Sequence, residues 1–107
     1  DPQEEARDRV MAKGYWVVHL EVGDPGRYEE YRAFVGPFLA KNGGRFVVRG
    51  GRQIVAEGDV WPRTVVVEFE SFELAERLYY SPEYQEGLKL RSGASQANFA
   101  IVEGVEG

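Results

Sequence analysis

Residues 63–80 have the sequence RTVVVEFESFELAERLYY, and the hydrophobic pattern changes its period within them. Residues 63–69 are rich in β-branched and aromatic residues, which is typical of a β-strand. Ser71 is a suitable helix N-cap, and apolar residues then recur at helical spacing from Phe72 to Tyr79. This segment therefore predicts a strand that leads directly into an amphipathic helix.

The chain before this segment follows the same plan. Residues 15–22 predict a first strand, and Asp24-Pro25 then provides an N-cap with proline at the first helical position, where the missing N–H is tolerated. The helix that follows should end at Gly43-Gly44, because glycine readily adopts the left-handed conformation that ends helices. Pro37 lies inside this helix and predicts a kink or an interruption near Gly36.

Three further elements complete the pattern. Residues 45–49 predict a second strand, which Gly50-Gly51 breaks, and Gln53 to Glu57 are interpreted as a short extension beyond a bulge or turn. Ser81-Pro82 repeats the signal of a cap followed by proline, so the second helix should break and restart there. Residues 98–103 predict the final strand.

The order strand, helix, strand, strand, helix, strand predicts an α+β fold of the ferredoxin-like βαββαβ type. In that fold a four-stranded antiparallel sheet carries both helices on one face. We expect one domain over residues 12–104, as a chain of 107 residues allows. Residues 1–11 are mostly charged and are interpreted as an N-terminal extension, native or added upstream, and residues 105–107 as a C-terminal tail.

Composition restricts the classes of function. The formal net charge of −5 disfavours a nucleic-acid partner and an anionic membrane surface, because both require clustered lysine and arginine. The chain has no cysteine and one histidine, which excludes thiol chemistry, disulfides, thiolate metal sites and a histidine-based metal cluster within one subunit. We expect no metal and no cofactor. No apolar run reaches the ~20 residues of a membrane span and no signal segment is visible, so a cytoplasmic location is predicted.

Alternation along each strand sorts the side chains into two faces. A uniformly apolar set predicts the face under the helices. The other set mixes valines with charged groups, and isolated charges are too costly for a core. This mixed set predicts an open face covered by a second copy, so that a homodimer encloses a cavity. The apolar set is Trp16, Val18, Leu20, Val22, Phe46, Val48, Val65, Val67, Phe69, Phe99 and Ile101, and the mixed set is Tyr15, Val17, His19, Glu21, Arg45, Val47, Arg49, Thr64, Val66, Glu68, Asn98, Ala100 and Val102.

Three residues of the mixed set form a candidate ligand site. The third strand should lie between the first and the second, which places Glu68 next to His19 and Arg49. Arg49 could then bind a small carboxylate while His19 or Glu68 moves a proton. The alternative interpretation is a purely structural ion pair between Arg49 and Glu68. Tyr80 and Tyr84 border the break in the second helix and are candidates for a pocket wall.

Two other features have simpler explanations. Gly43-Gly44-Arg45 and the glycine pair at residues 50–51 superficially resemble phosphate-binding loops, but neither precedes a helix, so we interpret them as turns. Trp61-Pro62 is interpreted as a packing plug or as a dimer contact.

Five short motifs carry a resemblance to a known family. They are KGYW at 13–16, GGRFVVRGG at 43–51, RTVVVEF at 63–69, SPEYQ at 81–85 and VEG at 102–104. In this order the chain resembles the bacterial domain-of-unknown-function family thirteen-thirty, in the dimeric α+β barrel superfamily. The resemblance implies a ferredoxin-like fold and a homodimer whose sheets face each other, and it implies no established activity.

The wider superfamily includes cofactor-independent monooxygenases, muconolactone isomerase-like enzymes, haem proteins and stress-responsive barrel proteins. His19 lies on a strand, which disfavours a haem role. The family resemblance also does not imply that other members have a histidine at this position. The resemblance therefore favours Arg49, Glu68 and Tyr84, which lie in or beside the five motifs, over His19 as site residues.

Three hypotheses of function follow from the sequence. The first is a dimeric protein that binds a small organic acid or aromatic compound in a cavity on the sheet face. The second is a cofactor-independent isomerase or monooxygenase-like enzyme. The third is a structural dimerisation module without a ligand, which a bidentate Arg49–Glu68 pair would favour. The sequence does not decide whether the protein is an enzyme.

Overall fold

A computed structural model describes residues 12–106, and the predicted extension at residues 1–11 lies outside the described residues. The elements follow the predicted order, with the second helix divided in two. They are β1 Gly14–Val22, α2 Pro25–Lys41, β2 Arg45–Arg49, β3 Arg63–Phe69, α3 Phe72–Tyr79, α4 Pro82–Leu88 and β4 Ser95–Glu103.

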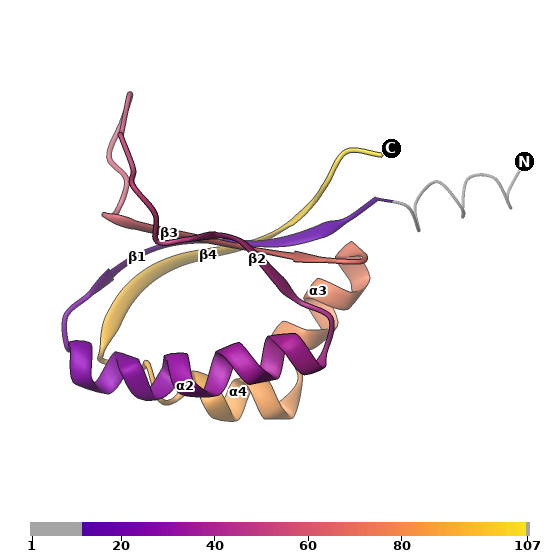
Figure 1. Ribbon diagram of the computed structural model, residues 1–107, viewed down its shortest axis with the longest axis horizontal. Coiled ribbons are helices and arrows are strands. Elements are labelled where there is room, and N and C mark those ends of the chain that lie inside the picture. The colour runs from indigo at the N-terminus through magenta and orange to yellow at the C-terminus, as the bar shows by residue number, and fades with distance from the viewer. Residues whose placement is uncertain (1–11, 107) are drawn as a thin grey trace, which may run out of the picture.

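The strands form one antiparallel sheet in the order β2-β3-β1-β4. The three helices cover one face of this sheet and leave the other face open (Figure 1). The predicted α+β fold of ferredoxin-like type is confirmed. β2 and β4 are the two edge strands, so residues on them lie at opposite sides of the space beneath the helices.

The core fills most of the space between sheet and helices, and Trp16 is its centre. Trp16 is 2% exposed, its ring lies 4.9 Å from those of Phe69 and Tyr84, and its Nε1 donates to the Ala75 carbonyl at 2.8 Å. Because the indole N–H is satisfied inside the fold, Trp16 serves packing.

The helix ends follow the predicted chemistry. Asp24 Oδ1 accepts from the Arg27 N–H at 3.1 Å, and Ser71 and Ser81 cap α3 and α4 in the same way. Gly43, with a φ of 86°, follows the end of α2. The predicted interruption near Gly36 is wrong, because α2 continues through Pro37. Pro37 lies on the exposed side of the helix, where water can bind the carbonyl that proline leaves without a partner.

The predicted strand extension at Gln53 to Glu57 is also wrong. Gly50 adopts a φ of 67°, and residues 51–62 leave the sheet as an arm on the side away from the helices (Figure 1). The Gln53 side chain holds the base of this arm, since it donates to the Trp61 carbonyl at 3.0 Å and accepts from the Thr64 hydroxyl.

A β-bulge in β2 changes which side chains face the helices. Phe46 pairs with Val67, but Val48 pairs with Val66, so Val47 is an extra residue and the alternation is inverted beyond it. Val48, predicted to lie under the helices, is instead on the open face and is 41% exposed. Arg49, predicted for the open face, lies on the helix side with its guanidinium 4.1 Å from the Phe46 ring centroid.

Candidate functional site

Glu68 binds neighbours other than those predicted. Arg45 Nη2 donates to Glu68 Oε1 at 2.8 Å, and the Tyr15 hydroxyl donates to Oε2 at 3.0 Å. The bond from Arg45, and then that from Tyr15, holds the pKa of Glu68 below its usual value. The hydrogen bond to Glu68 in turn raises the pKa of Tyr15. Both carboxylate oxygens of Glu68 are thus engaged in a network on the open face.

The predicted cluster of His19, Arg49 and Glu68 is wrong. His19 stands opposite Thr64, and its Nδ1 lies 3.0 Å from the Thr64 hydroxyl oxygen, so the strand register separates it from Glu68. The bulge turns Arg49 to the other side of the sheet. For the same reason, the alternative ion pair between Arg49 and Glu68 does not form.

The two predicted tyrosines have different environments. Tyr80 is 66% exposed and is not among the residues that line the cavity beneath the helices. Tyr84 is fully buried, and its hydroxyl lies 2.7 Å from that of Tyr31, which does line a cavity. Burial raises the pKa of both phenols, that of Tyr31 most strongly, so both remain protonated near neutral pH. Tyr84 therefore supports the cavity wall from behind.

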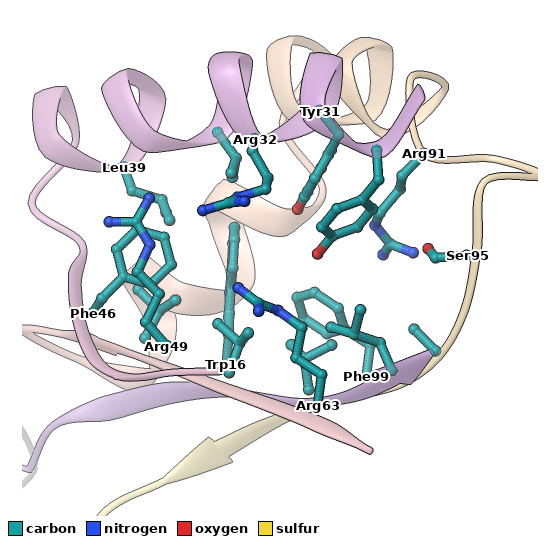
Figure 2. A pocket seen from close by; sticks show the side chains of 17 residues that line it. Trp16, Tyr31, Arg32, Leu39, Phe46, Arg49, Arg63, Arg91, Ser95 and Phe99 are labelled. Carbon is teal, nitrogen blue, oxygen red and sulfur yellow. The ribbon is translucent and has the colours of Figure 1, made fainter. Parts of the chain in front are cut away.

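A cavity of about 50 Å³ lies between the helix side of the sheet and α2. By the same measure one water needs roughly 10–15 Å³, so the space can hold more than a single water. Figure 2 shows that arginine side chains enter it from several directions. Its charged and hydroxyl-bearing residues are Arg32, Arg49, Arg63, Arg91, Tyr28, Tyr31 and Ser95, and the other walls are apolar or aromatic.

The four arginines come from three different elements of the fold and from the connection after α4. Arg32 descends from α2 and Arg63 rises from the start of β3, so that they enter the cavity from opposite walls (Figure 2). Arg49 reaches the cavity because of the bulge in β2. Arg91 follows α4 and lies 5.4 Å from the ring centroid of Tyr31. The fold thus brings four arginines to the lining of one cavity without a shared sequence motif.

Among residues 12–106, only Arg32 of these four has a carboxylate partner, Glu29, at 3.2 Å on the surface. No aspartate, glutamate or histidine occurs among the described residues that line the cavity. Like charges that converge without a counter-charge repel one another, most strongly where burial lowers the local dielectric. An anion in the cavity would relieve this repulsion.

Two polar atoms of the cavity lack partners. The Arg63 Nε and the Ser95 Oγ are buried and make no hydrogen bond within the described part of the chain. A buried polar group without a partner costs about 1–3 kcal/mol. Both residues line the cavity, so a molecule bound there could satisfy both atoms.

The position of Arg63 depends on Gly50. A Cβ at Gly50 would collide with the Arg63 guanidinium, and the φ of 67° also favours glycine. Gly50 also donates its N–H to the Thr64 carbonyl at 2.8 Å, which fixes the turn beside β3. The glycine pair that sequence analysis assigned to a turn therefore also makes room for a cavity residue.

Of the charged and hydroxyl-bearing residues that line this cavity, the sequence singled out only Arg49, and for the wrong face. One other carries a recognisable signal: Arg63 precedes Val65 by two positions, so strand alternation places it under the helices. Arg32 lies beside the buried stripe of α2 and is 44% exposed, so helical periodicity does not distinguish it from other surface residues. Arg91 lies in the irregular connection between α4 and β4, and Ser95 stands at its end. Neither helical nor strand periodicity predicts where side chains in such a connection point.

Two kinds of site are not found within the described residues. Residues 12–106 contain no group of three or more histidine, cysteine, aspartate or glutamate side chains placed to hold a metal ion. No helix in the same region is long and apolar enough to cross a membrane.

The fold and the cavity define an α+β protein of ferredoxin-like type with an arginine-lined space beneath its helices. The model of the family described as Domain of unknown function (DUF1330) matches residues 13–105. The chain belongs to this family, as the five motifs predicted. No functionally curated protein matches its sequence significantly.

Solved structures share the fold at low sequence identity. A protein of unknown function from Rhodopseudomonas palustris, RPA0582, is 18% identical with a TM-score of 0.71, over 99% of this chain and 92% of that one. SnoaB, a cofactor-independent oxygenase from Streptomyces nogalater, is 18% identical with a TM-score of 0.57, over 85% of this chain and 91% of that one. A dimeric protein of unknown function and ferredoxin-like fold from Bacteroides fragilis is 13% identical with a TM-score of 0.58, over 85% and 95%. At these identities the likeness shows the fold alone.

Proposed function

We propose that this protein binds a small organic acid in the cavity between its sheet and α2. The observation that carries the proposal is the convergence of four arginines on a space whose described lining contains no acidic residue. The ligand is still the one predicted from sequence, a small organic acid or aromatic compound. The site differs, because it lies beneath the helices instead of on the open face.

The chemistry of the walls favours an organic anion. A guanidinium binds a carboxylate through two parallel hydrogen bonds, and such charge-assisted bonds are the stronger ones in proteins. The apolar walls include Trp16, Phe46 and Phe99, which would cover a hydrocarbon or aromatic part of the ligand. The hydroxyls of Tyr28 and Tyr31 add neutral hydrogen-bonding groups.

The two alternative functions receive less support. An isomerase that transfers a proton needs a base, and the described lining contains no histidine and no carboxylate. A monooxygenase-like activity is supported only by analogy of fold with SnoaB. A structural dimerisation module without a ligand would have been favoured by an ion pair between Arg49 and Glu68. That pair does not form, because Glu68 pairs with Arg45. Binding is therefore the function that the arginines explain best. A cytoplasmic location is part of this proposal.

Binding is tested with a panel of simple aliphatic and aromatic carboxylates, each compared with its uncharged amide. Thermal unfolding and calorimetry should show binding of at least one carboxylate and much weaker binding of its amide. Arg63→Met keeps most of the side-chain volume and removes the charge. Loss of a hydrogen bond between charged groups corresponds to about 1.5–3 kcal/mol, so this variant should bind roughly ten- to a hundredfold more weakly.

Arg77→Met is the matched control, because Arg77 is an exposed residue of α3 outside the cavity lining. It should bind like the wild type. The proposal is wrong if no carboxylate binds at millimolar concentration, or if the two variants lose affinity equally.

We also propose that two copies associate through their open sheet faces. On that face Val48 is 41% exposed and Val102 is 43% exposed. Val66 belongs to β3, the strand between β2 and β1, and lies on the same face. Exposed apolar side chains grouped on one face mark association surfaces. The dimeric ferredoxin-like protein from Bacteroides fragilis supports this arrangement by analogy of fold.

Analytical ultracentrifugation of Val48→Asp tests this association. A charge within a sheet-to-sheet contact should convert the dimer to a monomer. Glu73→Lys on α3 changes the charge on the opposite side of the molecule and should leave the dimer intact. A monomeric wild type at micromolar concentration would contradict the proposal.

A further inference from the structure

The positive charge of the cavity exceeds what one carboxylate can balance. Arg49, Arg63 and Arg91 have no carboxylate within ion-pair distance among residues 12–106. Arg63 and Arg91 are partly buried, whereas Arg49 is exposed at the end of β2. A ligand with a single negative charge would leave at least one of the partly buried guanidiniums without a counter-charge, which is unfavourable, so the charge count favours a ligand with two anionic groups.

The charges also stand at different places. Arg49 belongs to β2 and lies over Phe46, whereas Arg91 lies 5.9 Å from the ring centroid of Phe99 on β4. β2 and β4 are the opposite edges of the sheet, separated by three strand intervals of ~4.8 Å, or roughly 14 Å in all. Figure 2 shows Arg49 at one end of the cavity and Arg91, beside Ser95, at the other.

The middle of the cavity is of a different kind. Its floor is formed by residues of the two central strands, including Trp16, Val18 and Val65, and Val35 of α2 lies above. Arg63 enters from the start of β3, between the two edges. A ligand that follows this arrangement has an apolar body between two charged ends, with Arg63 able to bind either end.

We propose that the ligand of this cavity is an organic dicarboxylate, with one carboxylate at Arg49 and the other at Arg91 and Ser95. This inference rests on the proposed binding of an organic acid and specifies its class. The Ser95 hydroxyl would donate to the second carboxylate and so obtain the partner that it lacks. A compact dianion such as phosphate cannot occupy both ends at once.

The test compares dicarboxylates with their own monomethyl esters. Succinate, adipate and terephthalate are titrated by calorimetry against the corresponding monoester, which keeps the body of the molecule and removes one charge. Inorganic phosphate is the compact control. At least one diacid should bind roughly ten- to a hundredfold more tightly than its monoester, as expected for loss of one charged contact.

Two variants then locate the ends. Arg49→Met and Arg91→Met should each reduce the preference for the diacid over the monoester to less than about threefold, while Arg77→Met should leave the wild-type preference unchanged. Arg91 packs on Tyr31 and Phe99, so if Arg91→Met does not fold, Arg49→Met alone decides the question.

The outcomes separate this inference from the proposed function. Equal affinity for diacid and monoester overturns the dicarboxylate but leaves an organic-acid site. A diacid preference that survives Arg49→Met overturns the placement of the two ends. Phosphate binding without binding of any carboxylate, or no binding at all, overturns the organic-acid site as well.

Discussion

Replacing Gly50 by alanine should weaken ligand binding much more than it weakens the fold. Gly50 has a φ of 67°, and a non-glycine residue in the left-handed region costs about 1–2 kcal/mol. Its added Cβ would collide with the guanidinium of Arg63. A guanidinium at the end of a flexible side chain can swing away at little cost in stability, but it then leaves its place in the cavity.

Gly43→Ala is a matched control for the cost of placing alanine in a left-handed backbone conformation. Gly43 has a φ of 86°, and a Cβ added there would meet no other group within 4 Å, so alanine introduces the strain without the collision. Both variants should lower the free energy of unfolding by a similar ~1–2 kcal/mol. For a domain of about 100 residues, each kcal/mol lowers the Tm by roughly 4–8 °C.

The assay measures Tm with and without the carboxylate that stabilises the wild type most. Gly43→Ala should keep the ligand-induced increase in Tm, and Gly50→Ala should lose most of it. Arg63→Met should lose the increase as well, and adding Gly50→Ala to Arg63→Met should cause little further loss. Wild-type affinity in a folded Gly50→Ala variant would show that the cavity does not require Arg63 in this position.

Two further predictions concern neighbouring contacts. Tyr84→Phe removes the 2.7 Å contact between the Tyr84 and Tyr31 hydroxyls and leaves one buried hydroxyl without this partner. It should lower the free energy of unfolding by about 1–3 kcal/mol, measured by urea denaturation, and an unchanged midpoint would contradict the role given to this pair. The pKa of Glu68 is lowered in the fold, so its stabilising effect is present above the unfolded pKa and is lost as the pH falls through the folded value. Glu68→Gln should therefore destabilise the protein at neutral pH and have a smaller effect in acid, as Tm measured against pH can show; equal effects at both pH values would contradict this.

Strand alternation predicted most of the fold because three of the four strands are regular. In β1, β3 and β4 the helix-side positions are mostly apolar, with Arg63 and Ser95 as exceptions, and the apolar residues pack beneath the helices as expected. β2 contains two adjacent valines, Val47 and Val48, either of which suits either face of a sheet. The bulge therefore leaves no mark in the sequence, and the error it caused reversed the placement of Arg49.

The candidate site was harder to predict because its residues are far apart in the sequence. Arg63 occupies a position that strand periodicity assigns to the buried side, where a charged residue contradicts the pattern, whereas the side chain of Arg32 is 44% exposed and contradicts nothing. Such a contradiction is itself a signal, since buried charges need a partner. Arg91 had no comparable signal, because its position depends on how the connection after α4 returns to β4.

β2 relates the two proposals, because its last residues face opposite ways. Val48 lies on the open face proposed for the dimer, and the next residue, Arg49, enters the cavity proposed for the ligand. β2 is an edge strand with a single neighbour, so little else in one copy restrains it. A second copy packed on Val48 would hold β2 in place and would thereby restrict the positions available to Arg49. Any such effect must be reciprocal: if the dimer binds the ligand more tightly, the ligand must strengthen the dimer by the same factor. The bulge at Val47 makes this coupling possible. Without it, Val48 would lie under the helices and Arg49 on the open face, so neither residue would reach its proposed site.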